Sequence, residues 1–136
     1  MTDDREPVSA AEVHRRLVEA YGDVLAGRLD EALELIDPDV VDHRGGIFGD
    51  YHGREAWRRT WESVAENGFR NVSVTIEQNA SDGEMSVNRY ISRGVHRATG
   101  RHYEILTIDM VRVRGGRVVE HWTLRDVDAM RNQLTR

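Results

Sequence analysis

The chain has 136 residues, a formal net charge of −5 at pH 7 and no cysteine. This length fits one domain, residues 1–136, and the lack of cysteine excludes disulfides, thiol nucleophiles and cysteine-based zinc sites. All 19 basic residues are arginines, so lysine Schiff-base chemistry and a phosphate-loop lysine are excluded as well. There is no basic stripe, no apolar leader and no apolar run of membrane-spanning length. We therefore expect a cytoplasmic protein with neither a nucleic-acid nor a membrane partner.

Three helices are predicted in the first half of the chain, with one short strand among them. The first helix begins at the capping box Ser9-Ala10-Ala11-Glu12 and ends at Gly27. The second stops before Asp37-Pro38, because the residue before a proline disfavours helix. In chain order we expect helix at about 10–25, helix at 29–36, strand at 40–43, glycine-containing loop at 44–46 and 49–50, and helix at 54–66.

The second half of the chain predicts strands. Apolar and polar residues alternate from Phe69 onward, and Gly115-Gly116 is typical of a tight hairpin turn. The expected strands are 69–78, 84–96, 101–114 and 117–125, followed by a short helical tail at 127–134. The order is ααβα and then four antiparallel strands, which is typical of an α+β fold.

Asp109 is the most informative candidate residue, because it interrupts the otherwise apolar strand segment Ile105–Val111. Burying an ionised carboxylate is costly unless it finds a partner or shifts its pKa. An ion pair with Arg89 on the preceding strand would make Asp109 structural. Burial among aliphatic side chains would instead raise its pKa and suit it to proton transfer beside a carbonyl group.

Three segments of the chain, together with the order of its elements, resemble the NTF2-like superfamily and, within it, the SnoaL-like polyketide cyclases. They are 39–43 (Asp-Val-Val-Asp-His), Arg89 with 94–96 and 99–101, and 109–122 with Gln133-Leu134 near the end. The resemblance implies a curved antiparallel sheet wrapped by three N-terminal helices into a cone with an internal pocket. It also implies intramolecular aldol closure of a polyketide ester without any metal or cofactor.

The resemblance also implies roles for individual residues. Asp109 matches the acid/base aspartate of the cyclases, and His96 matches the histidine of their Gly-Thr-His motif, which here reads Gly-Val-His and precedes a shorter loop. His96 would orient the substrate carbonyl or share a proton with Asp109. Asp42 and His43 are neighbours on a strand, so only one can face the pocket; the cyclase pattern favours His43. Arg89 would tune Asp109. The expected apolar wall consists of Trp57, Trp61, Tyr90 and Trp122.

Two other functions remain open at this point. Ketosteroid isomerases, of the same superfamily, place their base at the position of Asp42 and a hydrogen-bonding aspartate at that of Asp109, with a tyrosine for which Tyr21 is the candidate here. Alternatively, the domain could be a non-catalytic ligand-binding or dimerisation module whose cone is filled by side chains. The histidines are scattered, so no metal site is expected.

The expected partners are a small hydrophobic substrate and a second copy of the chain. In this kind of fold the open face of the curved sheet packs against a partner copy. We therefore expect a homodimer, with outward residues of the last three strands at the interface.

Overall fold

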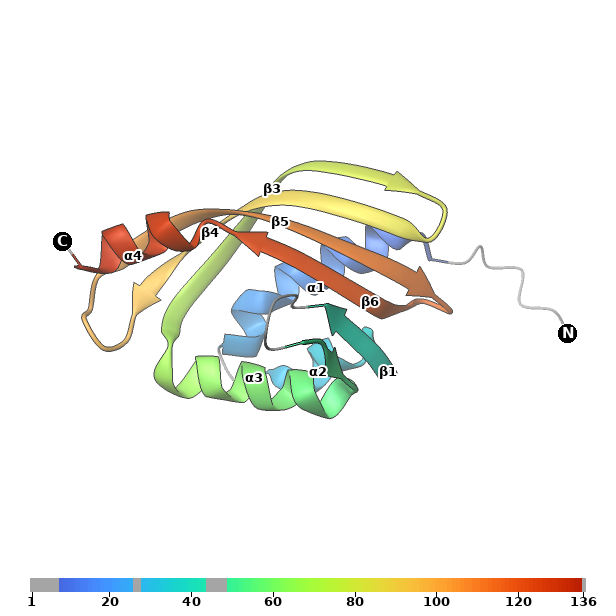
Figure 1. The fold of residues 1–136 in the computed structure, drawn as a ribbon, viewed down its shortest axis with the longest axis horizontal. Coiled ribbons are helices and arrows are strands. Elements are labelled where there is room, and N and C mark those ends of the chain that lie inside the picture. Colours follow the sequence, from blue (N-terminus) through green and yellow to red (C-terminus); the bar gives the residue numbers. More distant parts are fainter. Residues whose placement is uncertain (1–7, 26–27, 44–48, 136) are drawn as a thin grey trace, which may run out of the picture.

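The computed structural model describes residues 8–25, 28–43 and 49–135 and has the predicted α+β architecture (Figure 1). The elements are α1 (Ala10–Leu25), α2 (Leu29–Leu33), β1 (Ile36–His43), β2 (Tyr51–His52), α3 (Arg54–Asn67), β3 (Phe69–Asp82), β4 (Met85–His96), β5 (His102–Arg114), β6 (Arg117–Arg125) and α4 (Val127–Thr135). Within these residues no helix is long and apolar enough to cross a membrane. The predicted end of the first helix, at Gly27, lies outside the described residues, and so does the predicted loop at 44–46.

The six strands form one sheet in the order β2-β1-β6-β5-β4-β3. All neighbouring strands are antiparallel except β1 and β6, which run parallel. The long strands β3 to β6 curve over α1, and α3 lies on the other side of α1 (Figure 1). The short strand β2, which the sequence did not predict, pairs with β1 at one edge of the sheet.

Most predicted boundaries hold within one residue, but β3 continues to Asp82, four residues past its predicted end, and the segment after α2 differs as well. The second helix ends at Leu33, and β1 already begins at Ile36 rather than at Val40. Ile36 pairs with Val118 of β6, and the Val118 amide donates to the Leu35 carbonyl. Pairing with β6 therefore extends this segment, and Pro38 lies at an exposed position on the strand, where a missing N–H is tolerated.

The hydrophobic core fills only one end of the space between the sheet and the helices. It is formed by residues of α1, α2, β1, α3, β5 and β6, among them Leu17, Ile36, Trp57, Val111 and Val118. The predicted capping box is present, since the Glu12 amide donates to Ser9 Oγ at 3.1 Å. The other end of the space, toward the start of β5, contains the candidate site.

Candidate functional site

Asp109 lies on the inner face of β5, at the boundary between the core and a cavity. On this face of the strand, Val111 and Val113 belong to the core, whereas Ile105 and Thr107 line the cavity. Successive inward residues on a strand are about 7 Å apart. Asp109 is 1% exposed, so its carboxylate needs charged or hydrogen-bonding partners inside the protein.

Three side chains surround the Asp109 carboxylate. His121 Nε2 lies 2.9 Å from Oδ1, and His14 Nε2 lies 3.4 Å from the same oxygen. The Tyr21 hydroxyl donates to Oδ2 at 3.0 Å. Within the described residues, Oδ1 and the two facing Nε2 atoms make no well-directed hydrogen bond. His121 and His14 thus face Oδ1 at close range without a directed hydrogen bond, whereas Tyr21 donates one to Oδ2.

These contacts extend into a buried network, defined here as Asp42, His121, Asp109, His14 and Tyr21. His121 Nδ1 donates to Asp42 Oδ1 at 2.8 Å, because Asp42 and His121 are register partners on the parallel strands β1 and β6. His14 Nδ1 is hydrogen-bonded to Ser86 Oγ of β4 at 2.8 Å. His14 and Tyr21 are seven residues apart on α1, which places both on the same helix face. The His121 imidazole thus lies between two carboxylates.

The charges of the network differ from the sequence prediction. Burial raises the pKa of the Asp109 carboxyl, but the charge and contact of His121, aided by His14, outweigh it, so this pKa lies below the ordinary value of 3.8. Burial likewise lowers the pKa of His121, but Asp109 and Asp42 together raise it to about 9. The predicted raised pKa of Asp109 is therefore wrong. At neutral pH Asp109 is a carboxylate and His121 an imidazolium.

A cavity of about 160 Å³ opens beside this network. Tyr21, Asp42 and His121 contribute to its wall, so three members of the network border the space directly. The other lining residues are Trp57, Thr60, Trp61, Val64, Phe69, Val72, Tyr90, Ser92, Tyr103, Ile105, Thr107, Arg125 and Met130. The cavity is thus aromatic along its sides and charged at its inner end, as expected of a small-molecule site.

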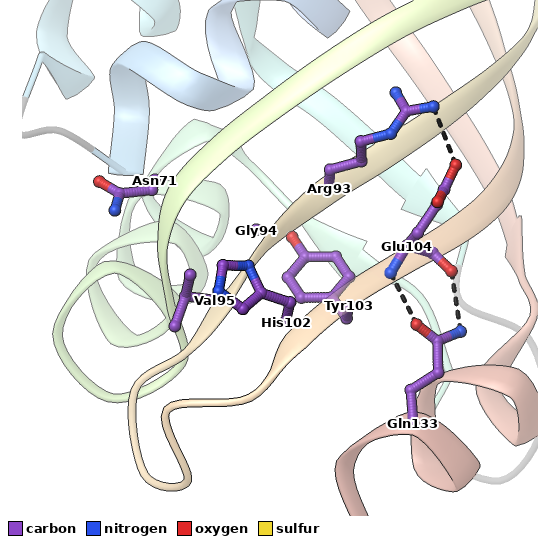
Figure 2. A pocket seen from close by; sticks show the side chains of 8 residues that line it. All are labelled: Asn71, Arg93, Gly94, Val95, His102, Tyr103, Glu104 and Gln133. Atoms are coloured by element: carbon purple, nitrogen blue, oxygen red, sulfur yellow. Dashed lines mark hydrogen bonds and ion pairs between the residues drawn. The ribbon is translucent and has the colours of Figure 1, made fainter.

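A larger and more open hollow of about 460 Å³ lies near the hairpin between β4 and β5 (Figure 2). The side chain of Gln133 on α4 accepts from the Glu104 amide at 2.7 Å and donates to the Glu104 carbonyl at 2.8 Å, so it fastens α4 to β5. Tyr103 borders both spaces, and its ring lies so close to Gly94 that a Cβ there would be 2.8 Å from Tyr103 Cε1. Glycine at position 94 therefore lets Tyr103 take its place in the cavity wall.

Five of the residues proposed from the sequence for binding border the cavity. Trp57 and Trp61 reach it from α3 and Tyr90 from β4, as expected for an apolar wall. Asp42, rather than His43, is the inward member of its pair, and Tyr21 faces Asp109. The isomerase alternative needs Asp42 and Asp109 in one pocket with Tyr21 between them. Asp42 and Tyr21 border the cavity, whereas Asp109 does not line it and contacts Tyr21 instead.

His43 and Trp122 lie outside the cavity, so their proposed positions in its wall are wrong. The His43 imidazole interacts with Asp50 and Glu120 and stacks on Trp122, with ring centroids 4.7 Å apart. The reason is a register shift between β5 and β6, which falls between Arg112 and Val113 of β5. The extra residue turns Trp122 to the outer face and His121 to the inner face, because strand side chains alternate.

Arg89 and His96 are also remote from Asp109, which corrects both of their expected roles. Arg89 pairs with Glu77 on the outer face, since its neighbours Asn88 and Tyr90 point inward. His96 is hydrogen-bonded to Thr99 at 2.9 Å and lies eight residues beyond Asn88, the register partner of Asp109. Eight residues of strand span about 26 Å. His96 therefore shares no proton with Asp109.

Sequence reasoning missed His14 and His121, the two histidines that do contact Asp109. The signal for His14 was present, because it shares a helix face with Leu17, Val18 and Tyr21, all of α1. The sequence gives a weaker indication for His121. Regular pairing in the β5–β6 hairpin would turn Trp122 to the inner face, and only the register shift turns His121 there instead.

The comparisons with known proteins agree with this structure. A model of the SnoaL-like domain matches residues 14–121. IdmH of Streptomyces antibioticus, described as a candidate polyketide cyclase, is 30% identical over 92% of this chain and 99% of its own, with a TM-score of 0.75. A loop-truncated IdmH variant is 32% identical over 90% of this chain and 98% of its own, with a TM-score of 0.72.

A candidate SnoaL-like polyketide cyclase from Jannaschia sp. CCS1 has the same fold, with a TM-score of 0.77 over 98% of both chains, at 18% identity. No curated protein sequence matches the chain. The family match covers most of the domain. It begins at His14, ends at His121 and therefore includes all five residues of the buried network. The chain belongs to the family of SnoaL-like domains, with the NTF2-like fold.

Proposed function

We propose that this protein is a cofactor-independent acid/base enzyme that acts on a small hydrophobic molecule bearing carbonyl groups. Ring closure by intramolecular aldol addition, as in polyketide cyclases, is the proposed reaction. One observation carries this proposal: the His121 imidazolium lies between Asp42 and Asp109 at the inner end of an aromatic cavity. Ionisable groups with displaced pKa values in such a cavity are typical of acid/base sites.

The proposed chemistry uses the groups that border the cavity. The Asp42 carboxylate accepts a proton from a carbon next to a carbonyl, and the resulting enolate carbon forms a bond to a second carbonyl carbon. The alkoxide then takes a proton from the Asp42–His121 pair, which returns to its starting state. Asp109 acts here as a positioning residue that keeps His121 charged, and Tyr21 in turn orients Asp109. Trp57, Trp61 and Tyr90 supply the apolar surface.

The volume of the cavity limits what can enter it. Ligand pockets commonly measure about 300–1,000 Å³, whereas a cavity of about 150 Å³ holds benzene. The value of about 160 Å³ here fits one ring or a folded segment of comparable size. A larger substrate would place its reacting segment inside and extend the remainder through the mouth.

Double-bond isomerisation is the second candidate, and the inward position of Asp42 favours it. In this reaction Asp42 would carry a proton from one carbon to another. The hydrogen-bond donor to the substrate oxygen would differ from that of a ketosteroid isomerase, however. Asp109 is ionised and cannot donate, and the Tyr21 hydroxyl already donates to it.

A turnover assay distinguishes these two reactions. The protein is incubated separately with an aromatic β-keto ester able to cyclise and with a β,γ-unsaturated cyclic ketone. We expect the ring-closed isomer of the first compound, detected by chromatography and mass spectrometry, and little conjugated enone from the second, detected by ultraviolet absorbance. The opposite pattern would establish the isomerase, and no product from either would favour the non-catalytic binding module.

We further propose a homodimer formed through the outer face of the sheet. Apolar side chains of β5 and β6 are exposed there, with Leu124 73% and Ile108 45% accessible. Ile108 and Leu124 are register partners, and Met110 and Trp122 form the next such pair. A contiguous apolar patch of this kind is typical of a protein interface. Arg89, Arg93 and Arg112 lie beside it, where charged residues suit an interface rim.

Leu124→Arg is expected to convert this dimer to a monomer, because a charge at the centre of an apolar interface would be buried without a partner. Sedimentation velocity should give twice the chain mass for the unaltered protein and the single-chain mass for the variant. Val8→Arg, an equivalent change at another exposed apolar residue, is the control and should remain dimeric. A monomeric unaltered protein, or a dimer that tolerates both Leu124→Arg and Ile108→Arg, would contradict the proposed interface.

A further inference from the structure

Arg125 is a cation in the wall of the cavity that has no anionic partner among the residues the structure describes. It is the last residue of β6 and lines the cavity together with Thr107, its register partner on β5. Within residues 8–25, 28–43 and 49–135, its side chain forms no ion pair and no hydrogen bond, whereas other arginines of the sheet, such as Arg89, Arg93, Arg112 and Arg114, pair with glutamates.

The register of the sheet fixes the distance between Arg125 and the buried network. The inward positions of β6 are His121, Thr123 and Arg125, so the first and last lie about 13 Å apart along the strand. Tyr90, Thr107 and Arg125 form one row across three strands, and Asn88, Asp109 and Thr123 form the next row. Arg125 therefore lies two rows from His121, and it is exposed whereas His121 is buried, which puts Arg125 at the open end of the cavity.

The two ends of the cavity consequently differ in charge. The inner end carries the carboxylates of Asp42 and Asp109, which flank the His121 imidazolium. The outer end carries the Arg125 guanidinium. Burial raises the pKa of Tyr21, Tyr90 and Tyr103, and the Arg125 charge opposes that rise at all three. Its field therefore reaches the phenols along the cavity wall.

We infer that the substrate carries a carboxylate, which Arg125 binds while the reacting carbonyl segment occupies the inner end. A guanidinium is well suited to this role because its planar N–H groups can donate two parallel hydrogen bonds to a carboxylate. The Asp42 and Asp109 carboxylates would repel a substrate carboxylate at the inner end. The two ends thus fix the direction in which the molecule enters, which an aromatic wall alone would not do.

This inference rests on the proposed use of the cavity as a substrate site, but it can be tested without turnover. The probes are cinnamate, a flat aromatic carboxylate, and cinnamamide, its neutral analogue of nearly the same shape. Calorimetric titration of each into the unaltered protein, and into Arg125→Gln and Arg125→Lys, measures the preference for the anion. Arg117→Gln is the matched control, since Arg117 is an exposed arginine at the other end of the same strand.

Cinnamate should bind at least about tenfold more tightly than cinnamamide, a preference typical of one charge-assisted hydrogen-bonded pair. Arg125→Gln should abolish this preference with the affinity for cinnamamide unchanged, Arg125→Lys should retain part of it, and Arg117→Gln all of it. Added salt should weaken cinnamate binding alone. Equal binding of both probes, no binding of either, or a preference that survives Arg125→Gln would overturn the inference. An inactive protein that still passes this test would refute the reaction but not the anion site.

Discussion

Asp109→Asn is expected to lower kcat by about 10³-fold or more while the chain stays folded. The amide has nearly the same shape but no charge, so His121 loses the stronger of its two anionic neighbours. In serine proteases, replacing the aspartate that orients the catalytic histidine by asparagine costs about 10⁴-fold. The loss here should be similar in kind, because Asp109 both charges and positions His121. The measurement is single-substrate kinetics on whichever compound the turnover assay identifies.

The folded state should tolerate this change because His121 can lose its proton once Asp109 is neutral, which leaves no unpaired buried charge on the imidazole. Circular dichroism and thermal unfolding should therefore show a native fold with moderately reduced stability. Asp128→Asn is the control, since Asp128 is an exposed carboxylate at the start of α4 and lies outside the cavity wall. Turnover of Asp109→Asn within about threefold of the unaltered protein would show that the network is structural.

The protonation of His121 is expected to govern both stability and activity above neutral pH. Its pKa is raised from the ordinary 6.5 to about 9 in the folded protein. A raised folded-state pKa stabilises the protein fully below the unfolded value, and this stabilisation is lost as pH rises through the folded value. The free energy of unfolding should therefore fall between about pH 6.5 and 9, by at most about 3 kcal/mol. Urea unfolding at successive pH values measures this loss.

The activity should follow the same group, since kcat/KM reports the ionisations of the free enzyme. We expect kcat/KM to decline above about pH 9, because the imidazolium is the proton source for the alkoxide. His121→Gln should remove most of the turnover and also the decrease in stability between pH 6.5 and 9. His52→Gln, at an exposed histidine of β2, should change neither. A stability profile of His121→Gln that parallels that of the unaltered protein would rule out a charged His121 in the fold.

The sequence predicted the architecture well because its signals are local. Amphipathic spacing, the capping box at Ser9 and the turn at Gly115-Gly116 depend on neighbouring residues, and all three correspond to features of the structure. Asp109 stood out for a similar reason, since a carboxylate within an apolar strand is visible without knowing its partners. Its burial and its closeness to the cavity agree with that reading.

The partners of Asp109 could not be predicted with the same certainty, because they depend on register. One extra residue in β6 decides whether His121 or Trp122 faces inward, and no residue near Val119 marks this irregularity in the sequence. The protonation state of Asp109 is hard to predict for the same reason. Burial alone predicts a raised pKa for Asp109, but a neighbouring imidazolium reverses the direction, and that neighbour lies on another strand.

The central claim is that the buried network removes a proton from carbon beside a carbonyl group. Hydrogen–deuterium exchange at that carbon tests it most directly, since exchange needs no ring closure and no knowledge of the natural substrate. A small aromatic ketone such as acetophenone is incubated in D₂O at neutral pD, and loss of its methyl signal is followed by proton NMR. We predict exchange that is faster with the protein than with buffer and falls to the buffer rate with Asp109→Asn. Equal rates for the unaltered protein, Asp109→Asn and buffer would contradict the claim.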